Sequence, residues 1–196
     1  VMTLRLIKAE VERMLREQGY AVGRYTSPHL SAYNERILFK GKMISDKRLE
    51  ALEEEMAPLL RRLQRAGKPP SPFEAFTVLA LQHFEQEDAE IVVLEAGLGG
   101  RLDATNICPG KTAVIPSIAF DHSEYLGHTL PRIAREKAGV IKAKASVVNG
   151  ATQPSVLKAI SSECRKRSAP LYSLHKDFSY SRVRCTEKRT AFDYQG

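Results

Sequence analysis

Four polar side chains cluster in a glycine-rich segment that follows an apolar run. The run "AEIVVL" leads into "EAGLGGRLDATN", residues 95–106, which carries Glu95, Arg101, Asp103 and Asn106. In an α/β sheet, ligands bind at the carboxyl ends of the strands, where Glu95 would lie. A carboxylate there is well placed to bind a cation. Three interpretations compete: a dinucleotide-binding fingerprint, a plain turn, or a site for metal and phosphate.

Two glycine motifs in this region do not match known phosphate-binding patterns. A dinucleotide fingerprint needs G-x-G-x-x-G before a helix, but Leu102 takes the third glycine position, and the "DATNICPG" that follows is typical of a turn. A P-loop around "GKT", residues 110–112, would need glycine where Thr105 stands and a helix where "AVIPSI" follows. A plain turn explains the glycines but not the polar cluster.

A second polar pair follows the next predicted strand. Asp121 and His122 come after "TAVIPSI", within "SIAFDHSEYLGHTLPRIAREKAGVIK". A histidine alone is more often structural than a ligand, but Glu95 and Asp121 make a ligand role more plausible. If the two strands are neighbours, their ends meet at one edge of the sheet. We therefore expect Glu95 and His122 to approach within the distance of a shared metal.

The composition is that of a globular chain. Its 196 residues, 43% of them hydrophobic, suffice for one sizeable core, so a single domain is the default. No apolar run reaches the roughly 20 residues that span a bilayer, and charges interrupt the N-terminal segment where a signal peptide would be apolar. Cys108, Cys164 and Cys185 lack metal-ligand spacing, which favours reduced thiols. We expect a cytoplasmic protein.

The net charge of +7 does not by itself indicate nucleic-acid binding. The basic residues are spread through mixed-sign stretches such as "DKRLEALEEEMAPLLRRLQRAGK", which is typical of a solvated helix face. "CRKRSAP" and "SRVRCTEKR" concentrate positive charge but lack the interleaved aromatic residues that stack on bases. We expect small anionic ligands, no nucleic-acid or membrane partner, and a monomer.

Helices and strands alternate along the chain. Helical periodicity covers residues 3–18 and 46–64, and a capping box of Ser71 with Glu74 starts a third helix. "YAVGRYTS" predicts a short strand, and "ILFKGKMI" predicts a hairpin that turns at Gly41.

Three continuous apolar runs, "EIVVLEA", "TAVIPSI" and "ASVVNG", predict strands that are covered on both faces. A helix is predicted from about Pro131 to Gly139. The pattern predicts an α/β fold with a doubly wound, mostly parallel sheet flanked by helices. The final "TAFDYQG" is strand-like with no partner in view, which suggests a piece of a longer protein.

Four motifs together resemble one enzyme family. "YTSPHLSAYNERI", "FEAFTVLAL", "VLEAGLGGRLDATN" and "SIAFDHSEYLGHTLPRIAREKAGVIK" occur in the order and approximate spacing of the folylpolyglutamate synthase and dihydrofolate synthase family, a branch of the Mur ligase superfamily. The match spans most of residues 1–150 and is loose over 151–196. It implies the P-loop NTPase-like central domain of Mur ligases. It also implies a ligase that uses ATP to convert the carboxylate of dihydropteroate or a folate into an acyl phosphate, which the amine of glutamate attacks.

The resemblance also implies a set of site residues. Glu95 would bind Mg²⁺, with His122 joining it at a second Mg²⁺ and the Ser27 hydroxyl completing that site. Lys137 corresponds to a lysine that family members carry as a carbamate. The carbamate is an oxygen donor that takes the place of the cationic ammonium. It forms only from a neutral amine, which implies a lowered pKa for this lysine. Asp103 and Asn106 would contact the nucleotide or order the loop. The substrate pocket would be shaped by Ser27, Pro28, His29, Arg36 and Phe73.

Two parts of the family pattern are not found in the sequence. The P-loop of the family, glycine-threonine-asparagine-glycine-lysine-glycine-serine, would immediately precede Val1. The C-terminal domain, which binds glutamate and part of ATP, would follow. We therefore expect residues 1–196 to be a truncated catalytic, ATP-binding domain that does not turn over alone.

Two other functions remain alternatives. A Mur-type ligase for a peptidoglycan precursor would typically follow its metal-binding glutamate with a Ser-Ser pair, whereas "AGLGGRLDATN" follows Glu95. The folate branch therefore fits better. The other alternative is a noncatalytic domain that keeps the fold, which an activity assay would separate from a ligase.

Overall fold

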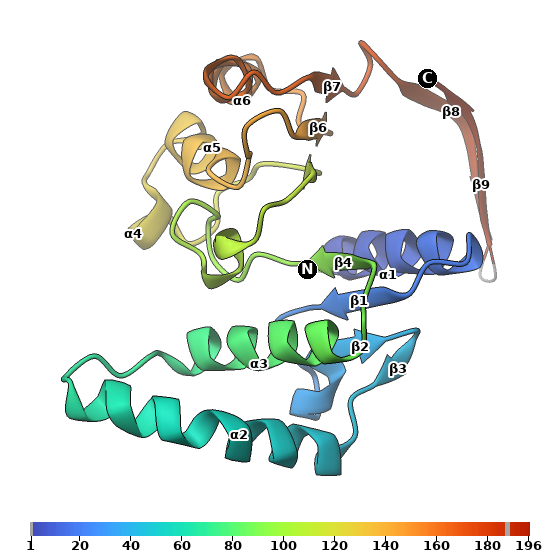
Figure 1. Cartoon of the computed structure of the whole chain (residues 1–196). Helices are drawn as coiled ribbons and strands as arrows, with labels where there is room; N and C mark the ends of the chain where they lie inside the picture. Colours follow the sequence, from blue (N-terminus) through green and yellow to red (C-terminus); the bar gives the residue numbers. More distant parts are fainter. Residues whose placement is uncertain (1, 187–188) are drawn as a thin grey trace. The chain divides into compact units, whose positions relative to one another are not determined.

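The computed structural model of the chain describes residues 2–186 and 189–196 (Figure 1). The chain divides into two compact units. The N-terminal unit runs to residue 97 and includes residues 103–105, and the C-terminal unit holds residues 98–102 and the chain from 106 onward. Each contains parallel strands flanked by helices, so the predicted α/β fold class is confirmed. Among the described residues, no helix has both the length and the apolar character needed to cross a membrane.

A four-stranded sheet in the order β3-β2-β1-β4 lies at the centre of the N-terminal unit. Its strands are β1 (Val22–Tyr25), β2 (Ile37–Phe39), β3 (Lys42–Met43) and β4 (Ile91–Leu94). The antiparallel pair β2–β3 is the predicted hairpin around Gly41. β1 and β4 are parallel, with Tyr25 opposite Leu94. Because these two strands end together, the residues that follow them lie at one edge of the sheet.

Three helices pack around this sheet: α1 (Met2–Glu17), α2 (Asp46–Arg65) and α3 (Pro72–Gln86). α1 lies over one face, α3 lies over the other, and α2 packs outside α3 (Figure 1). At the start of α3, Ser71 and Glu74 bond reciprocally, so the predicted capping box is confirmed. The core of the unit consists of Tyr25, Ile37, Ile44, Leu52, Met56, Phe76, Leu79, Ala80 and Phe84.

The C-terminal unit is built on a parallel three-stranded sheet in the order β5-β6-β7. Its strands are β5 (Thr112–Ile115), β6 (Ser146–Asn149) and β7 (Leu171–Ser173), and its helices are α4 (Ser123–Leu126), α5 (Leu130–Ala138) and α6 (Pro154–Lys166). α5 packs against α6. The helix predicted to run from about Pro131 to Gly139 is confirmed, with Gly139 as its C-cap. The fully buried core side chains include Ile133, Ile141, Val147, Val156 and Ile160.

The end of the chain forms an antiparallel hairpin of β8 (Ser179–Cys185) and β9 (Thr190–Gln195). The expectation that "TAFDYQG" has no partner is therefore wrong. β8 pairs with it through a register shift between Ser181 and Arg184. A shift of this kind breaks the regular alternation by which paired strands are recognised in a sequence.

Candidate functional site

Glu95 and Ser27 meet at the edge where β1 and β4 end. The Glu95 main-chain N–H donates a 3.0 Å hydrogen bond to the Tyr25 carbonyl, which continues the pairing of the two strands. The Ser27 main-chain N–H then donates a 2.8 Å hydrogen bond to Glu95 Oε2. The side chain of Glu95 is 17% exposed, so the carboxylate is partly desolvated. This edge therefore holds the predicted acid in a fixed orientation.

The second oxygen of Glu95 has a cationic partner. The Lys8 ammonium, from α1, forms an ion pair with Glu95 Oε1. Lys8 is only 9% exposed, although a lysine in an amphipathic helix would ordinarily be placed in solvent. The sequence alone does not identify Lys8 as the partner of Glu95, because nothing distinguishes this lysine from the other basic residues of the helix.

The loop after β1 carries two of the residues predicted to shape the substrate pocket, His29 and Arg36. Arg36 Nε donates a 2.9 Å hydrogen bond to His29 Nδ1, so this ring nitrogen accepts. The guanidinium lies over the rings of Tyr33 and Phe76, at 5.5 and 5.6 Å from their centroids. Such cation–π contacts stabilise the guanidinium at this position over the rings. The predicted pair is thus brought together in the described structure, beside two aromatic residues that sequence reasoning did not single out.

Glu35 holds the same loop in place. Its carboxylate accepts hydrogen bonds from the main-chain N–H groups of Leu30, Ser31 and Ala32, at 2.7, 2.7 and 2.9 Å. These bonds lower the pKa of Glu35 to about 2. Glu35 stands at the third position of the short helix η1 (Tyr33–Arg36). The usual signal of a Ser or Thr three residues before the glutamate is missing, because Ala32 stands there.

Phe73 lies beside the glycine loop, and its part in a substrate pocket stays a prediction. A Cβ at Gly97 would come within 2.6 Å of Phe73 Cζ, so a larger residue there would force the ring to move. Phe73 also contacts Tyr25, with ring centroids 6.1 Å apart. Burial raises the pKa of Tyr25, whose hydroxyl lies 3.2 Å from Thr77 Oγ1. Aromatic rings and a glycine main chain therefore form one side of the site.

Asp103 orders the glycine loop. Its Oδ2 accepts from the Gly97 N–H at 2.8 Å, and its Oδ1 accepts from the Thr105 N–H and hydroxyl at 2.9 and 2.6 Å. Asp103 is 8% exposed and Thr105 is 7% exposed. These contacts support the loop-ordering half of the prediction for Asp103. Its contact with a nucleotide stays a prediction.

Asn106, within the short helix η2 (Ala104–Ile107), joins the loop to the end of α5. Its Nδ2 donates to the carbonyls of Arg101 and Gly139, at 3.0 and 3.2 Å. The Arg101 main-chain N–H donates to the Glu136 carbonyl at 2.9 Å, and Arg101 Nε also contacts both Glu136 carboxylate oxygens. The loop is therefore clamped to the last turn of α5, which carries Lys137.

The remaining predicted residues, His122 and Lys137, belong to the C-terminal unit. His122 precedes α4 with a left-handed main chain, and its Nε2 lies 3.6 Å from Asp121 Oδ1. Lys137 lies in the last turn of α5, where the sequence places it. Because Glu95 belongs to the other unit, its approach to His122 and Lys137 stays a prediction.

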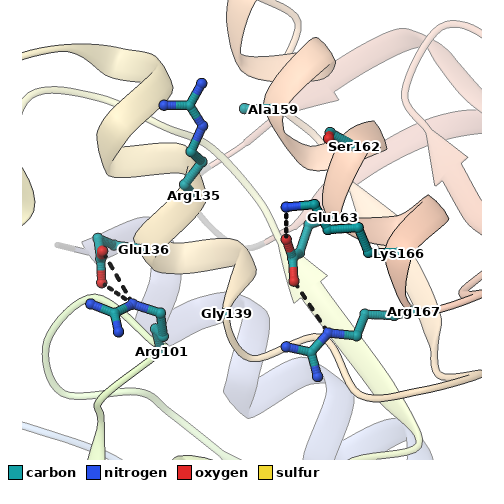
Figure 2. A pocket seen from close by; sticks show the side chains of 9 residues that line it. All are labelled: Arg101, Arg135, Glu136, Gly139, Ala159, Ser162, Glu163, Lys166 and Arg167. Carbon is teal, nitrogen blue, oxygen red and sulfur yellow. Dashed lines mark hydrogen bonds and ion pairs between the residues drawn. The ribbon is translucent and has the colours of Figure 1, made fainter.

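A groove of about 220 Å³ in the C-terminal unit also contains Arg101 (Figure 2). Its lining residues are Arg101, Arg135, Glu136, Gly139, Ala159, Ser162, Glu163, Lys166 and Arg167. Three of its cations already pair with carboxylates inside the groove, since Arg101 contacts Glu136 and both Lys166 and Arg167 contact Glu163 (Figure 2). These internal pairs weaken the groove as an anion site, and it contains none of the residues predicted for catalysis.

The oxygen donors at the strand edge suit Mg²⁺. Mg²⁺ is usually held by one or two carboxylates together with water and substrate phosphates, and less often by an all-protein cage. Glu95 provides the carboxylate and Ser27 a hydroxyl at the same edge. Over residues 2–186 and 189–196, no three His, Cys, Asp or Glu side chains gather into a group that could hold a metal ion. Substrate oxygens would therefore have to complete the coordination.

Comparison with known proteins gives one consistent family. No family model matches the chain. The chain is 42% identical over 169 residues to the dihydrofolate synthase/folylpolyglutamate synthase of Bacillus subtilis (strain 168), which covers 85% of the chain and 39% of the relative. It is 36% identical over 171 residues to the enzyme of the same name from Escherichia coli (strain K12), covering 87% of the chain and 39% of the relative. The chain thus spans about two fifths of the length of these relatives.

Solved structures agree with the sequence relatives. Folylpolyglutamate synthase from Thermotoga maritima superposes with a TM-score of 0.90 at 36% identity, covering 97% of this chain and 44% of that one. The Mycobacterium tuberculosis folylpolyglutamate synthase complexed with ADP gives a TM-score of 0.90 at 31% identity, covering 96% of this chain and 44% of that one. The similarity therefore extends over both units of the chain.

Proposed function

The chain belongs to the dihydrofolate synthase/folylpolyglutamate synthase family, and we propose that it supplies the catalytic, ATP-binding part of a ligase that joins glutamate to dihydropteroate or a folate. The observation that carries this proposal is the arrangement of Ser27, Glu95 and the loop tied by Asp103 at one sheet edge. The proposed products are an amide, ADP and phosphate.

This reaction requires the protein to position the substrates and to neutralise their negative charge. Transfer of a phosphoryl group to a carboxylate brings two anions together, so catalysis depends mainly on cations and oriented donors. The resulting acyl phosphate loses phosphate when the glutamate amine attacks its carbonyl carbon. The neutral amine forms the new C–N bond, and its surplus proton leaves to solvent or a nearby base.

Glu95, the Ser27 hydroxyl and His122 are the residues proposed to hold Mg²⁺. When bound, the metal would neutralise phosphate charge and orient the phosphoryl group. The hydrogen bond from the Ser27 N–H favours the orientation in which Glu95 lies at this edge. An imidazole is an unusual Mg²⁺ ligand on chemical grounds, so the part of His122 rests on the family resemblance.

Lys137 is proposed to carry a carbamate. Its neutral amine would add to carbon dioxide with loss of a proton, giving an anionic oxygen donor in place of an ammonium. The clamp formed by Arg101, Asn106 and Gly139 fixes the last turn of α5, where Lys137 lies. A fixed helix end would hold the main chain that carries the carbamate in one place.

The substrate pocket is proposed to involve the loop after β1 and Phe73. Arg36, His29 and the neighbouring rings offer a flat, partly apolar surface with hydrogen-bonding groups, which suits a heteroaromatic ring such as a pterin. Among the relatives' structures is an FPGS–AMPPCP–folate complex, at a TM-score of 0.88 and 32% identity over 92% of this chain and 44% of that one. Asp103 and Asn106 are proposed to present the loop to the nucleotide. We further propose a cytoplasmic monomer without nucleic-acid or membrane partners.

Substrate-dependent phosphate release tests this function. A polypeptide of the relatives' full length that contains residues 1–196 should release phosphate only when ATP, glutamate and either dihydropteroate or tetrahydrofolate are all present. Residues 1–196 alone should not turn over. Phosphate release at the same rate with and without the pterin substrates would contradict the proposal. Release with a peptidoglycan precursor in place of these substrates would also contradict it.

A further inference from the structure

We infer that Lys8 is a built-in counter-ion of Glu95, and that a divalent cation binds this carboxylate only when the Lys8 ammonium leaves it. The inference rests on the proposed role of Glu95 in metal binding. It concerns the regulation of that site and assigns a role to a residue that the proposed reaction does not use.

Both oxygens of Glu95 are already engaged. Oε2 accepts from the Ser27 N–H at 2.8 Å, and Oε1 pairs with the Lys8 ammonium. A divalent cation at Oε1 would have to occupy the position of the ammonium. If the ammonium stayed nearby, it would repel the metal across a partly desolvated space, where charges interact more strongly than in water.

The packing of α1 determines where Lys8 points. α1 lies against β1 and β4, and Lys8 and Glu12 stand one turn apart on its inner face, at 9% and 4% exposure. Glu12 pairs with Arg16 within the helix and lies 4.0 Å from Arg24 of β1. The buried face of the helix thus presents charges to the sheet at two successive turns. Displacing Lys8 from Glu95 requires a change of rotamer or a movement of this part of α1.

An ammonium and Mg²⁺ would also satisfy the carboxylate differently. The ammonium supplies one positive charge and hydrogen-bond donors, whereas Mg²⁺ needs about six oxygen ligands in octahedral geometry. With Lys8 in place, the carboxylate is neutralised without recruiting any further oxygen donor. The metal site would then assemble only when a ligand outside this ion pair draws the ammonium away.

Direct metal binding to the 196-residue chain tests the inference, with Mn²⁺ as a spectroscopic substitute for Mg²⁺. Free Mn²⁺ is measured by electron paramagnetic resonance in titrations of the native chain, Lys8→Met and Lys68→Met. Lys68 is exposed between α2 and α3 and provides the same change of charge away from Glu95. We expect Lys8→Met to bind Mn²⁺ at least about tenfold more tightly than Lys68→Met, because only the first frees Glu95 Oε1.

A double variant identifies the carboxylate involved. The gain should vanish in Lys8→Met/Glu95→Gln, and Mn²⁺ should raise the melting temperature of Lys8→Met but not that of the native chain. Affinities of Lys8→Met and Lys68→Met within twofold would overturn the inference, as would a gain that persists without Glu95. Circular dichroism checks folding, and Lys8→Gln replaces Lys8→Met if the latter does not fold.

A failure of the inference and a failure of the proposed function give different results. If the native chain and Lys8→Met bind Mn²⁺ equally and both lose it on Glu95→Gln, Lys8 is not a counter-ion that excludes metal, but Glu95 keeps its proposed role. If phosphate release by the full-length form does not depend on either pterin substrate, the proposed function fails, whereas the Mn²⁺ titrations still decide whether Lys8 blocks the carboxylate.

Discussion

Ser27 and Glu95, 68 residues apart in the sequence, are joined by a 2.8 Å hydrogen bond from the Ser27 main-chain N–H to Glu95 Oε2. The bond follows from the parallel pairing of β1 with β4, which brings the ends of the two strands to one edge. One oxygen of the acid is therefore oriented by main-chain geometry, while the other pairs with the side chain of Lys8. Because this bond comes from the main chain after β1, a glycine loop can follow Glu95 without removing the bond that orients its side chain.

Gly139→Ala should destabilise the clamp between the glycine loop and α5. A Cβ at this position would lie 2.3 Å from Arg101 Cβ and 2.5 Å from Arg101 Cα, so the main chain must shift. We expect a loss of about 1–3 kcal/mol in the free energy of unfolding, measured by urea denaturation. Gly110→Ala is the matched control, since its Cβ would meet nothing closer than 3.9 Å. Equal stability of the two variants would contradict the clamp.

Glu35 should contribute stability that is lost in acid. Its pKa falls from 4.5 to about 2 because three main-chain N–H groups bond to the carboxylate. The contribution is therefore complete above about pH 4.5 and disappears as the pH falls through about 2. We expect Glu35→Gln to be less stable than the native chain at pH 6, with the difference shrinking towards pH 2 in urea titrations. A constant difference across this range would show that the three bonds do not depend on the charge.

His83 should make the chain less stable on mild acidification. Burial lowers the pKa of this α3 residue from 6.5, and its side chain is only 5% exposed. Just below pH 6.5 the unfolded chain therefore binds a proton that the folded chain does not, so the free energy of unfolding falls with pH. His83→Phe should reduce this slope between pH 7 and 5 in urea denaturation. An unchanged slope would assign the effect to other groups.

Sequence reasoning located the elements because their signals are local. The Ser71–Glu74 capping box, the turn at Gly41 and the helix end at Gly139 each follow from a few neighbouring residues. The ion pair of Lys8 with Glu95 could not be predicted, because it depends on which face of α1 packs on the sheet.

The loop contacts needed coordinates for a related reason. The sequence singles out Asp103 and Asn106 but not their partners. These partners are main-chain groups, which every residue carries, so the residue types do not identify them. Glu35 was missed because its N-cap position holds Ala32, which has no hydroxyl to complete the familiar pattern. The pairing of β9 with β8 was missed because it contains a register shift.

Lys137→Ala should reduce the activity of the full-length form about 10- to 100-fold, as expected when an oxygen donor near a metal is removed. Acetate should restore part of the activity by occupying the vacant oxygen positions. Lys158→Ala, at an exposed position of α6, is the comparison for a lysine outside the proposed site. The assay is phosphate release in buffers free of small carboxylates. Full activity of Lys137→Ala there would remove this lysine from the site.

Phosphate release by Glu95→Gln in the full-length form tests the central claim most directly. The glutamine keeps an oxygen that can accept from the Ser27 N–H but loses the charge that a metal needs. Glu90→Gln, which changes an acid at the opposite end of β4, is the matched control. The account predicts that Glu95→Gln lowers the rate at least about 100-fold with a native circular dichroism spectrum, while Glu90→Gln stays within a few-fold of the native rate. Equal rates for the two folded variants would contradict a catalytic role for Glu95.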